Sequence, residues 1–213
     1  MTSFFSRHFS KASSNANSSY LEPDARAYDY TNTSPTLSIS TSTTNPGLLV
    51  VQYDGAPQNT LPLYSIAPHA MSPGMLIVYR GLPDPTGQMG PIGHITCSSE
   101  TSAELNMRGC AMKLKMSQLS GDFSVTGTPM GKIKWKSSQL TGGSTLTLCD
   151  SNGKKLAKTK TKKAGFGDQK IEMLVPYDEM VVEIAVVTAY QAKAMAERAI
   201  NSVVEVMSAV SGS

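Results

Sequence analysis

The chain has few of the residues that build metal sites and disulfide frameworks. Its 213 residues include three cysteines and three histidines. An odd number of cysteines without Cys-x-x-Cys spacing argues against both a disulfide framework and a zinc site, so we expect reduced, mostly buried thiols. The histidines, His8, His69 and His94, lie too far apart to form a motif such as HExxH. We therefore expect neither a metal nor a cofactor.

Sequence motifs of the common enzyme classes are also absent. The chain has no Gly-x-Ser-x-Gly elbow of a serine hydrolase, no Walker loop and no glycine fingerprint of a dinucleotide-binding fold. His94 and Cys97 are three residues apart, and on a strand such positions point to opposite faces, so they cannot form a thiol–imidazole pair. We expect a protein that is not an enzyme.

No segment is apolar for the length that a membrane-spanning helix needs. Such a helix takes about 20 predominantly apolar residues, and every window of that length that spans residues 180–190 contains Glu183 and at least one further charged residue, such as Lys193. The N-terminus lacks a secretory apolar region. We expect a cytoplasmic protein that can associate peripherally with membranes. The alternative is a mitochondrial location, because three phenylalanines in residues 1–11 lie on one helical side, away from Arg7 and Lys11.

From Gly47 onward the dominant period is two. Short apolar, β-branched or aromatic runs are separated by Gly, Pro, Asn or Asp, and Ser-Asn-Gly at 151–153 is typical of a tight hairpin. Thr-Gly-Gly at 141–143 and residues 164–168 are further hairpin loops. At least nine strands at this spacing predict a mainly β, antiparallel sandwich or barrel. The runs lie at 48–53, 61–66, 75–80, 92–98, 110–117, 122–127, 131–137, 144–150, 154–162 and 169–175.

The composition divides the chain in two. Residues 1–45 are rich in Ser, Thr and Asn, and we expect a flexible leader there. Residues 46–210 are expected to form a single domain. An alternative is that residues 36–42, in which Leu37 and Ile39 alternate with polar residues, form a further strand of that domain.

The period changes after Pro176. Asp178 is a good helix cap, and from Met180 to Tyr190 only Glu183 and Thr188 are polar. A helix that is apolar on all sides must be enclosed by protein, so a helix from about residue 178 is expected inside a closed barrel. The alternative is that this β-branched run forms a last strand.

Three segments of the C-terminal half carry a family resemblance: GKIKWK (131–136), TLTLCDSNGKKLAKTK (145–160) and QKIEMLVPYDEMVVEIAVVTAY (169–190). They resemble a family of small fungal proteins of unknown function in the tubby C-terminal-like superfamily, which includes the LURP-one-related proteins and the phospholipid scramblases. Ile133 stands where that family has tyrosine. The resemblance implies a closed antiparallel β-barrel around a C-terminal helix. Because tubby domains bind phosphoinositides, it also implies a lipid-binding surface. The matching residues are Gly131, Lys134, Trp135, Asp178, Glu179, Val181 and Val182.

Residues 109–170 contain twelve lysines and three aspartates, whereas the whole chain has a net charge of +3. Period two places Ile133 and Trp135 on the core face, and the same alternation points Lys113 and Lys115 outward. In residues 154–163, Ala157 and Thr159 are expected inward, and Leu156 breaks the pattern, which indicates a bulge or an exposed leucine. The candidate anion-binding residues are Lys132, Lys134, Lys136, Lys154, Lys158, Lys160 and Lys162.

These lysines predict a binding module for anionic phospholipid or phosphoinositide headgroups, because lysine suits diffuse attraction to phosphates. The alternative is a structural or protein-interaction barrel in which the lysines are a solvated face that keeps strand edges from pairing. Nucleic acid is a weaker candidate. The lysine-rich strands lack aromatic platforms for stacking bases, apart from Trp135, which is expected to point inward.

Overall fold

A computed structural model describes residues 34–57, 59–88, 90–138, 145–161, 169–176 and 178–211. In these residues a series of strands precedes one helix, α1 (Glu179–Ser211). The strands are β1 (Thr36–Thr41), β2 (Leu49–Tyr53), β3 (Tyr64–Pro68), β4 (Met75–Arg80), β5 (Gly93–Ser99), β6 (Ser102–Met107), β7 (Cys110–Met116), β8 (Phe123–Thr128), β9 (Gly131–Ser137), β10 (Leu146–Cys149), β11 (Lys155–Thr161) and β12 (Gln169–Met173). The ten predicted runs each overlap one of these strands, and the predicted mainly β class is confirmed.

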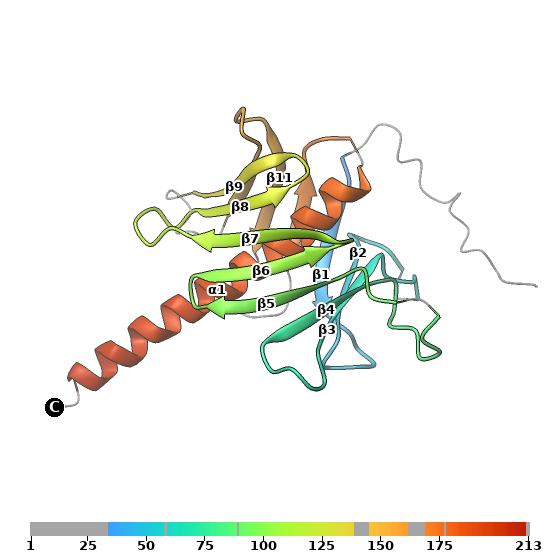
Figure 1. The fold of residues 1–213 in the computed structure, drawn as a ribbon, viewed down its shortest axis with the longest axis horizontal. Coiled ribbons are helices and arrows are strands. Elements are labelled where there is room, and N and C mark those ends of the chain that lie inside the picture. The colour runs from blue at the N-terminus through green and yellow to red at the C-terminus, as the bar shows by residue number, and fades with distance from the viewer. Residues whose placement is uncertain are drawn as a thin grey trace, which may run out of the picture.

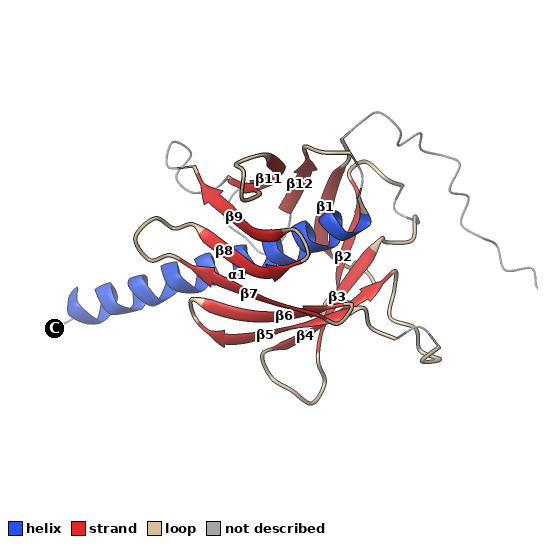
Figure 2. Ribbon diagram, turned by 45° about the horizontal axis from the view of Figure 1, so that its top comes forward, coloured by secondary structure: helices blue, strands red, loops and turns tan. Residues whose placement is uncertain are grey.

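The strands form one closed antiparallel barrel. Each strand pairs with its neighbours in sequence, and β1 pairs with β12 to complete the circle. Figures 1 and 2 show the strands arranged around α1. Closure leaves no strand of the barrel with an unpaired edge, which removes the exposed edges of an open sheet.

The closing strand comes from the segment that was expected to be a flexible leader. Leu37 of β1 lies opposite Tyr53 of β2 and Ile171 of β12, and both Leu37 and Ile39 are buried. The ordered domain therefore begins before β1 and not near residue 46, and the alternative interpretation of residues 36–42 as a strand is correct. Residues 1–33 of the expected leader lie outside the described residues.

Helix α1 starts where the sequence predicts. The backbone N–H of Val181 donates to Oδ1 of Asp178 at 3.0 Å, which is the hydrogen bond of a helix cap. Every residue from Val181 to Ala189 is buried, so the prediction of an enclosed helix is confirmed and the last-strand alternative is wrong. The helix extends well beyond this enclosed stretch. It continues to Ser211 and projects past the strands at the end of the barrel that carries the β5–β6 and β7–β8 turns (Figure 1).

The barrel and the helix share one core. Phe123 of β8 and Trp135 of β9 lie opposite each other and are fully buried. The indole N–H of Trp135 donates to Oγ1 of Thr188 at 2.9 Å. A buried indole needs such a partner, and this one lies on α1, so the hydrogen bond joins the sheet to the helix.

The structure tests several smaller predictions. The turn at 151–153 connects β10 to β11, and Gly153 there has a φ of 81°. Thr-Gly-Gly at 141–143, residues 164–168 and Lys162 lie outside the described residues. The three cysteines are free, as expected, but only Cys149 is buried, whereas Cys97 and Cys110 are half-buried.

Candidate functional site: a lysine face on the barrel

Strand β9 separates apolar from charged side chains. Ile133 and Trp135 are fully buried, whereas the three lysines of the strand are exposed. The hydrogen bond from Trp135 to α1 fixes which side of the strand faces inward. Because successive side chains of a strand point to opposite faces, Lys132, Lys134 and Lys136 must point outward. This prediction from the sequence is confirmed.

The strand register places lysines of β9 and β11 on the two sides of β10. Thr147 of β10 lies between Lys136 of β9 and Lys158 of β11. Cys149 lies in the same way between Lys134 and Lys155. Two strand spacings separate the lysines of each row by about 10 Å, and the rows are about 7 Å apart along β9. The four lysines therefore form a two-by-two array around β10.

A bulge creates the second row. Leu156 and Ala157 are consecutive on β11 and both are buried, and the pairing of β10 with β11 shifts between Leu148 and Cys149. The bulge expected at Leu156 is therefore present, and the alternative of an exposed leucine is wrong. The extra residue, Leu156, interrupts the alternation of side chains along β11, so that Lys155 before it and Lys158 after it point to the same face. As a result Lys155, which was not among the predicted site residues, is exposed like Lys154.

Ion pairs distinguish the lysines from one another. Lys160 bonds the carboxylate of Glu172 at 2.9 Å, although Glu172 lies directly opposite Lys158 in the register. Lys170 bonds Asp54 at 2.6 Å. Among the described residues, by contrast, no carboxylate lies within ion-pair distance of four outward lysines. We call these four the lysine face: Lys134, Lys136, Lys155 and Lys158.

Three of the other four predicted site residues lie around this array, and Lys162 lies outside the described residues. Lys132 and Lys154 are exposed near the β8–β9 and β10–β11 turns, at the opposite end of the barrel from the projecting part of α1. Lys160 borders the lysine face, but its charge is balanced by Glu172. Of the seven predicted residues the structure thus places Lys134, Lys136 and Lys158 in the array.

A second charged cluster, which sequence reasoning missed, anchors the start of α1. The side chain of Glu183 is 3% exposed, and the guanidinium of Arg108 donates to both of its carboxylate oxygens at 2.6–3.2 Å. Hydrogen bonding to Glu183 raises the pKa of Arg108 further above its ordinary value, and burial opposes this. Arg108 has a φ of 49° in the β6–β7 turn, a conformation that is uncommon outside glycine. The sequence signal for this pair is Glu183 itself, because an acidic residue in an apolar, enclosed stretch of helix requires a cationic partner.

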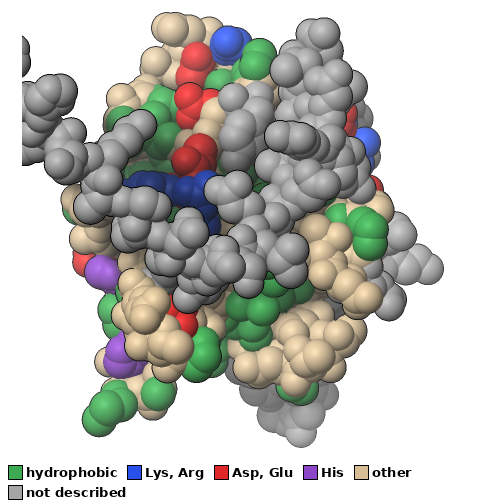
Figure 3. All heavy atoms as spheres, turned by 90° about the vertical axis from the view of Figure 1, so that its right-hand side faces the viewer, with side chains coloured by type: hydrophobic (Ala, Val, Ile, Leu, Met, Phe, Trp, Pro, Cys, Tyr) green, Lys and Arg blue, Asp and Glu red, His purple; other side chains and the backbone are tan. Residues whose placement is uncertain are grey.

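Glu179 extends this cluster toward the surface. Its Oε1 forms an ion pair with Arg80 at 3.0 Å and accepts a hydrogen bond from Arg108 at 3.2 Å. Figure 3, which views the end of the barrel where α1 begins, shows basic side chains lying beside acidic ones. Within this cluster the two arginines balance the two glutamates, which makes the cluster a poor attractor for an external anion compared with the lysine face.

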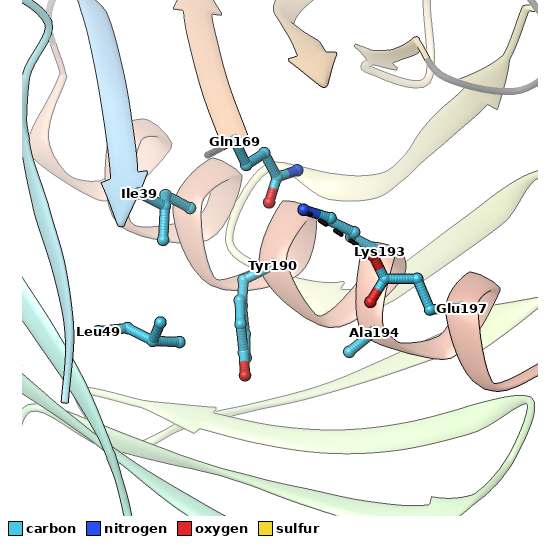
Figure 4. Close-up of a pocket in the computed structure, with 7 residues that line it drawn as sticks. All are labelled: Ile39, Leu49, Gln169, Tyr190, Lys193, Ala194 and Glu197. Carbon is cyan, nitrogen blue, oxygen red and sulfur yellow. Dashed lines mark ion pairs between the residues drawn. The ribbon is translucent and has the colours of Figure 1, made fainter. Parts of the chain in front are cut away.

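The other end of the barrel holds a small cavity of mixed polar and apolar lining beside α1 (Figure 4). Its volume is about 10 Å³, and it is lined by side chains that include Gln169, Tyr190, Lys193 and Glu197. Lys193 and Glu197 form an ion pair at 3.9 Å. Burial raises the pKa of the Tyr190 hydroxyl, and nearby Arg198 opposes the shift. A cavity of this size has room for about one water molecule and none for a lipid headgroup or a cofactor.

Neither a metal site nor a membrane-spanning helix is found among the described residues. Within the described ranges, no three side chains of His, Cys, Asp or Glu gather as a metal site would require. In the same part of the chain, no helix combines the length and the apolar character that crossing a bilayer demands.

Comparison with known proteins identifies no family for this chain. No protein-family model matches the chain, and no curated protein matches it. Among solved structures, the barrel is similar to the X-ray structure of a protein from Arabidopsis thaliana, with a TM-score of 0.48 and 11% sequence identity. The match covers 76% of this chain and 93% of the plant protein.

Proposed function

We propose that this protein is a non-enzymatic binding module of the tubby C-terminal-like superfamily that binds anionic phospholipid headgroups through its lysine face. The family resemblance of residues 131–190 and the closed barrel around a C-terminal helix support the superfamily assignment. The observation that carries the binding proposal is the two-by-two array of Lys134, Lys136, Lys155 and Lys158, which has no carboxylate partner among the described residues.

The geometry of the array suits phosphate groups. Its lysines are separated by about 7 Å along a strand and about 10 Å across β10, and a phosphoinositide headgroup carries its phosphates over a comparable span. Each basic residue near an anionic leaflet contributes about 1 kcal/mol of attraction. The four lysines of the face would therefore bind an anionic membrane through several weak attractions acting together. Binding of this kind is typical of a peripheral protein at the cytoplasmic surface of a membrane.

Vesicle sedimentation at low salt tests the proposal. The wild-type chain is mixed with vesicles of phosphatidylcholine alone, of phosphatidylcholine with phosphatidylserine, and of phosphatidylcholine with phosphoinositide. We expect sedimentation with the two anionic vesicles only. We also expect it to be lost near 1 M salt, where the Debye length falls to about 3 Å. Stronger binding to phosphoinositide than to phosphatidylserine at equal vesicle charge identifies a headgroup site.

Two double variants with equal net charge test whether binding depends on the lysine face or only on the net charge of the protein. Lys134→Gln with Lys158→Gln removes two members of the array and should weaken binding about 30-fold, since two lysines contribute about 2 kcal/mol. Lys113→Gln with Lys170→Gln removes two lysines that already pair with Glu104 and Asp54, and should change binding little. The proposal is wrong if the wild type binds neither anionic vesicle at low salt or if both double variants bind equally.

A further inference from the structure

The turn between β7 and β8 holds a leucine entirely in water. The side chain of Leu119 is 102% exposed, the highest value among the large apolar residues that the structure describes. The next, Met71 in the β3–β4 turn, is 87% exposed. A single exposed leucine is common on protein surfaces, so exposure alone assigns no role to it.

Hydrogen bonds fix the turn in a defined shape. The N–H of Ser117 donates to the carbonyl of Asp122 at 2.8 Å, and the N–H of Gly121 donates to the carbonyl of Ser117 at 2.9 Å. Oδ1 of Asp122 accepts from the N–H of Ser137 at 2.9 Å, which attaches the turn to the end of β9. None of these bonds involves the Leu119 side chain. The barrel thus presents this leucine on a fixed support without needing it for packing.

Lysines flank the same turn. Lys115 lies two residues before Ser117, and through Ser124 of β8 it shares a register row with Lys134 of the lysine face. Lys136 directly precedes Ser137, to which the turn is attached. In Figures 1 and 2 the β7–β8 turn lies on the same side of α1 as β9 and β11. The leucine therefore stands at the edge of the basic surface.

The acidic groups near the turn do not cancel this charge. Asp122 is half-buried, its carboxylate accepts from the N–H of Ser137, and its single negative charge is outnumbered by the three lysines on this side. Glu100 lies on the β5–β6 turn, on the side of β7 away from β9. The side toward the lysine face carries Lys115, Lys134 and Lys136, which have no ion-pair partner among the described residues.

We infer that Leu119 enters the apolar edge of an anionic bilayer when the lysine face docks on its headgroups. This inference rests on the proposed function. The lysines stay at the level of the phosphates, because ammonium groups remain hydrated, while the short turn carries one apolar side chain below them. Burying a leucine side chain is favourable by enough to change a partition constant about tenfold or more. The partner is a lipid surface and not a free headgroup, because a soluble headgroup offers no apolar layer.

A tryptophan at the turn reports this insertion directly. Trp135 is the only native tryptophan and is fully buried against α1, so its emission should not respond to vesicles. The variant Leu119→Trp adds a second, exposed indole. Its matched control is Met71→Trp, at another exposed hairpin turn that is separated from β9 by several strands. Both variants are mixed at low salt with vesicles that contain phosphatidylserine, with and without brominated lipid, and sedimentation is measured on the same samples.

We expect the emission of Leu119→Trp to move to shorter wavelength on the vesicles and to be quenched by brominated lipid, while that of Met71→Trp is unchanged. We also expect Leu119→Ala to weaken sedimentation about tenfold, with no change in thermal stability. If the protein sediments with the vesicles but both new indoles stay in water, the inference is overturned and the lysine face alone accounts for binding. If the wild type does not sediment at all, the proposed function fails and the inference fails with it.

Discussion

Glu183 shows how a single residue constrains the whole start of α1. It is buried in an otherwise apolar stretch of the helix, and its carboxylate is held by the guanidinium of Arg108. A buried carboxylate without a partner is far more costly than an exposed one, because water no longer solvates the charge. The β6–β7 turn, with Arg108 at a positive φ, is therefore fixed by an electrostatic requirement of the helix.

We predict that Arg108→Met lowers the free energy of unfolding by about 3–5 kcal/mol, because it leaves Glu183 buried without a partner. Urea denaturation followed by circular dichroism measures this loss. The control is Arg80→Met: Arg80 is 64% exposed and bonds the half-exposed Glu179, so this loss should be about 1 kcal/mol or less. Adding Glu183→Met to Arg108→Met should restore most of the stability. Equal effects of the two single variants would contradict the role assigned to this ion pair.

At the same scale, the sequence predicted the direction of most lysines but not their charge environment. Alternation alone places Lys134 and Lys136 outside, because Ile133 and Trp135 must be inside. It could not place Lys155, whose exposure follows from the bulge beside Leu156. Nor could it show that Lys160 is balanced by Glu172, because that carboxylate belongs to a neighbouring strand.

Individual elements differ in how clearly their sequence specifies them. Helix α1 was predicted from its cap and from an apolar pattern without a polar face, and both features are present. Strand β6 was missed. Its sequence, Ser-Ala-Glu-Leu-Asn-Met, contains no β-branched or aromatic residue, and strand propensity is correspondingly weak. Hydrogen bonding to β5 on one side and to β7 on the other holds this segment as a strand despite its weak propensity.

We predict that Val186→Asp unfolds the domain. Val186 is fully buried in the part of α1 enclosed by the barrel, and a carboxylate there would have no cation to pair with, at a cost of several kcal/mol. Thermal melting and the yield of soluble protein are the measurements. Asn201→Asp is the control, since this position on the same helix is exposed. A soluble Val186→Asp variant that melts like the wild type would show that α1 is not enclosed.

For the molecule as a whole, closure of the barrel depends on β1. This strand forms hydrogen-bonded ladders with β2 and with β12, and its inward residues Leu37 and Ile39 belong to the core. Without β1 the barrel would have two free edges and an uncovered patch of α1. Open edges and exposed core residues favour aggregation.

We predict that a chain lacking residues 1–41 loses cooperative unfolding and aggregates. A chain lacking residues 1–33 retains every strand pairing that the structure describes, so it should melt within a few degrees of the full chain. The comparison of these two truncations by calorimetry and size-exclusion chromatography isolates the contribution of β1. If the shorter chain melts like the longer one, β1 is dispensable and closure is not required for stability.

The sequence by itself determined the class of fold, the helix in the lumen and the outward direction of the lysines on β9. Those features follow from local periods of two or 3.6 and from the rule that apolar side chains leave water. Only the tertiary structure decided that residues 36–41 close the barrel, that Lys155 joins the lysine face, and that Arg108 holds Glu183. Each of these depends on pairing between segments far apart in the chain, and register between strands is set by the packing of the whole barrel around α1.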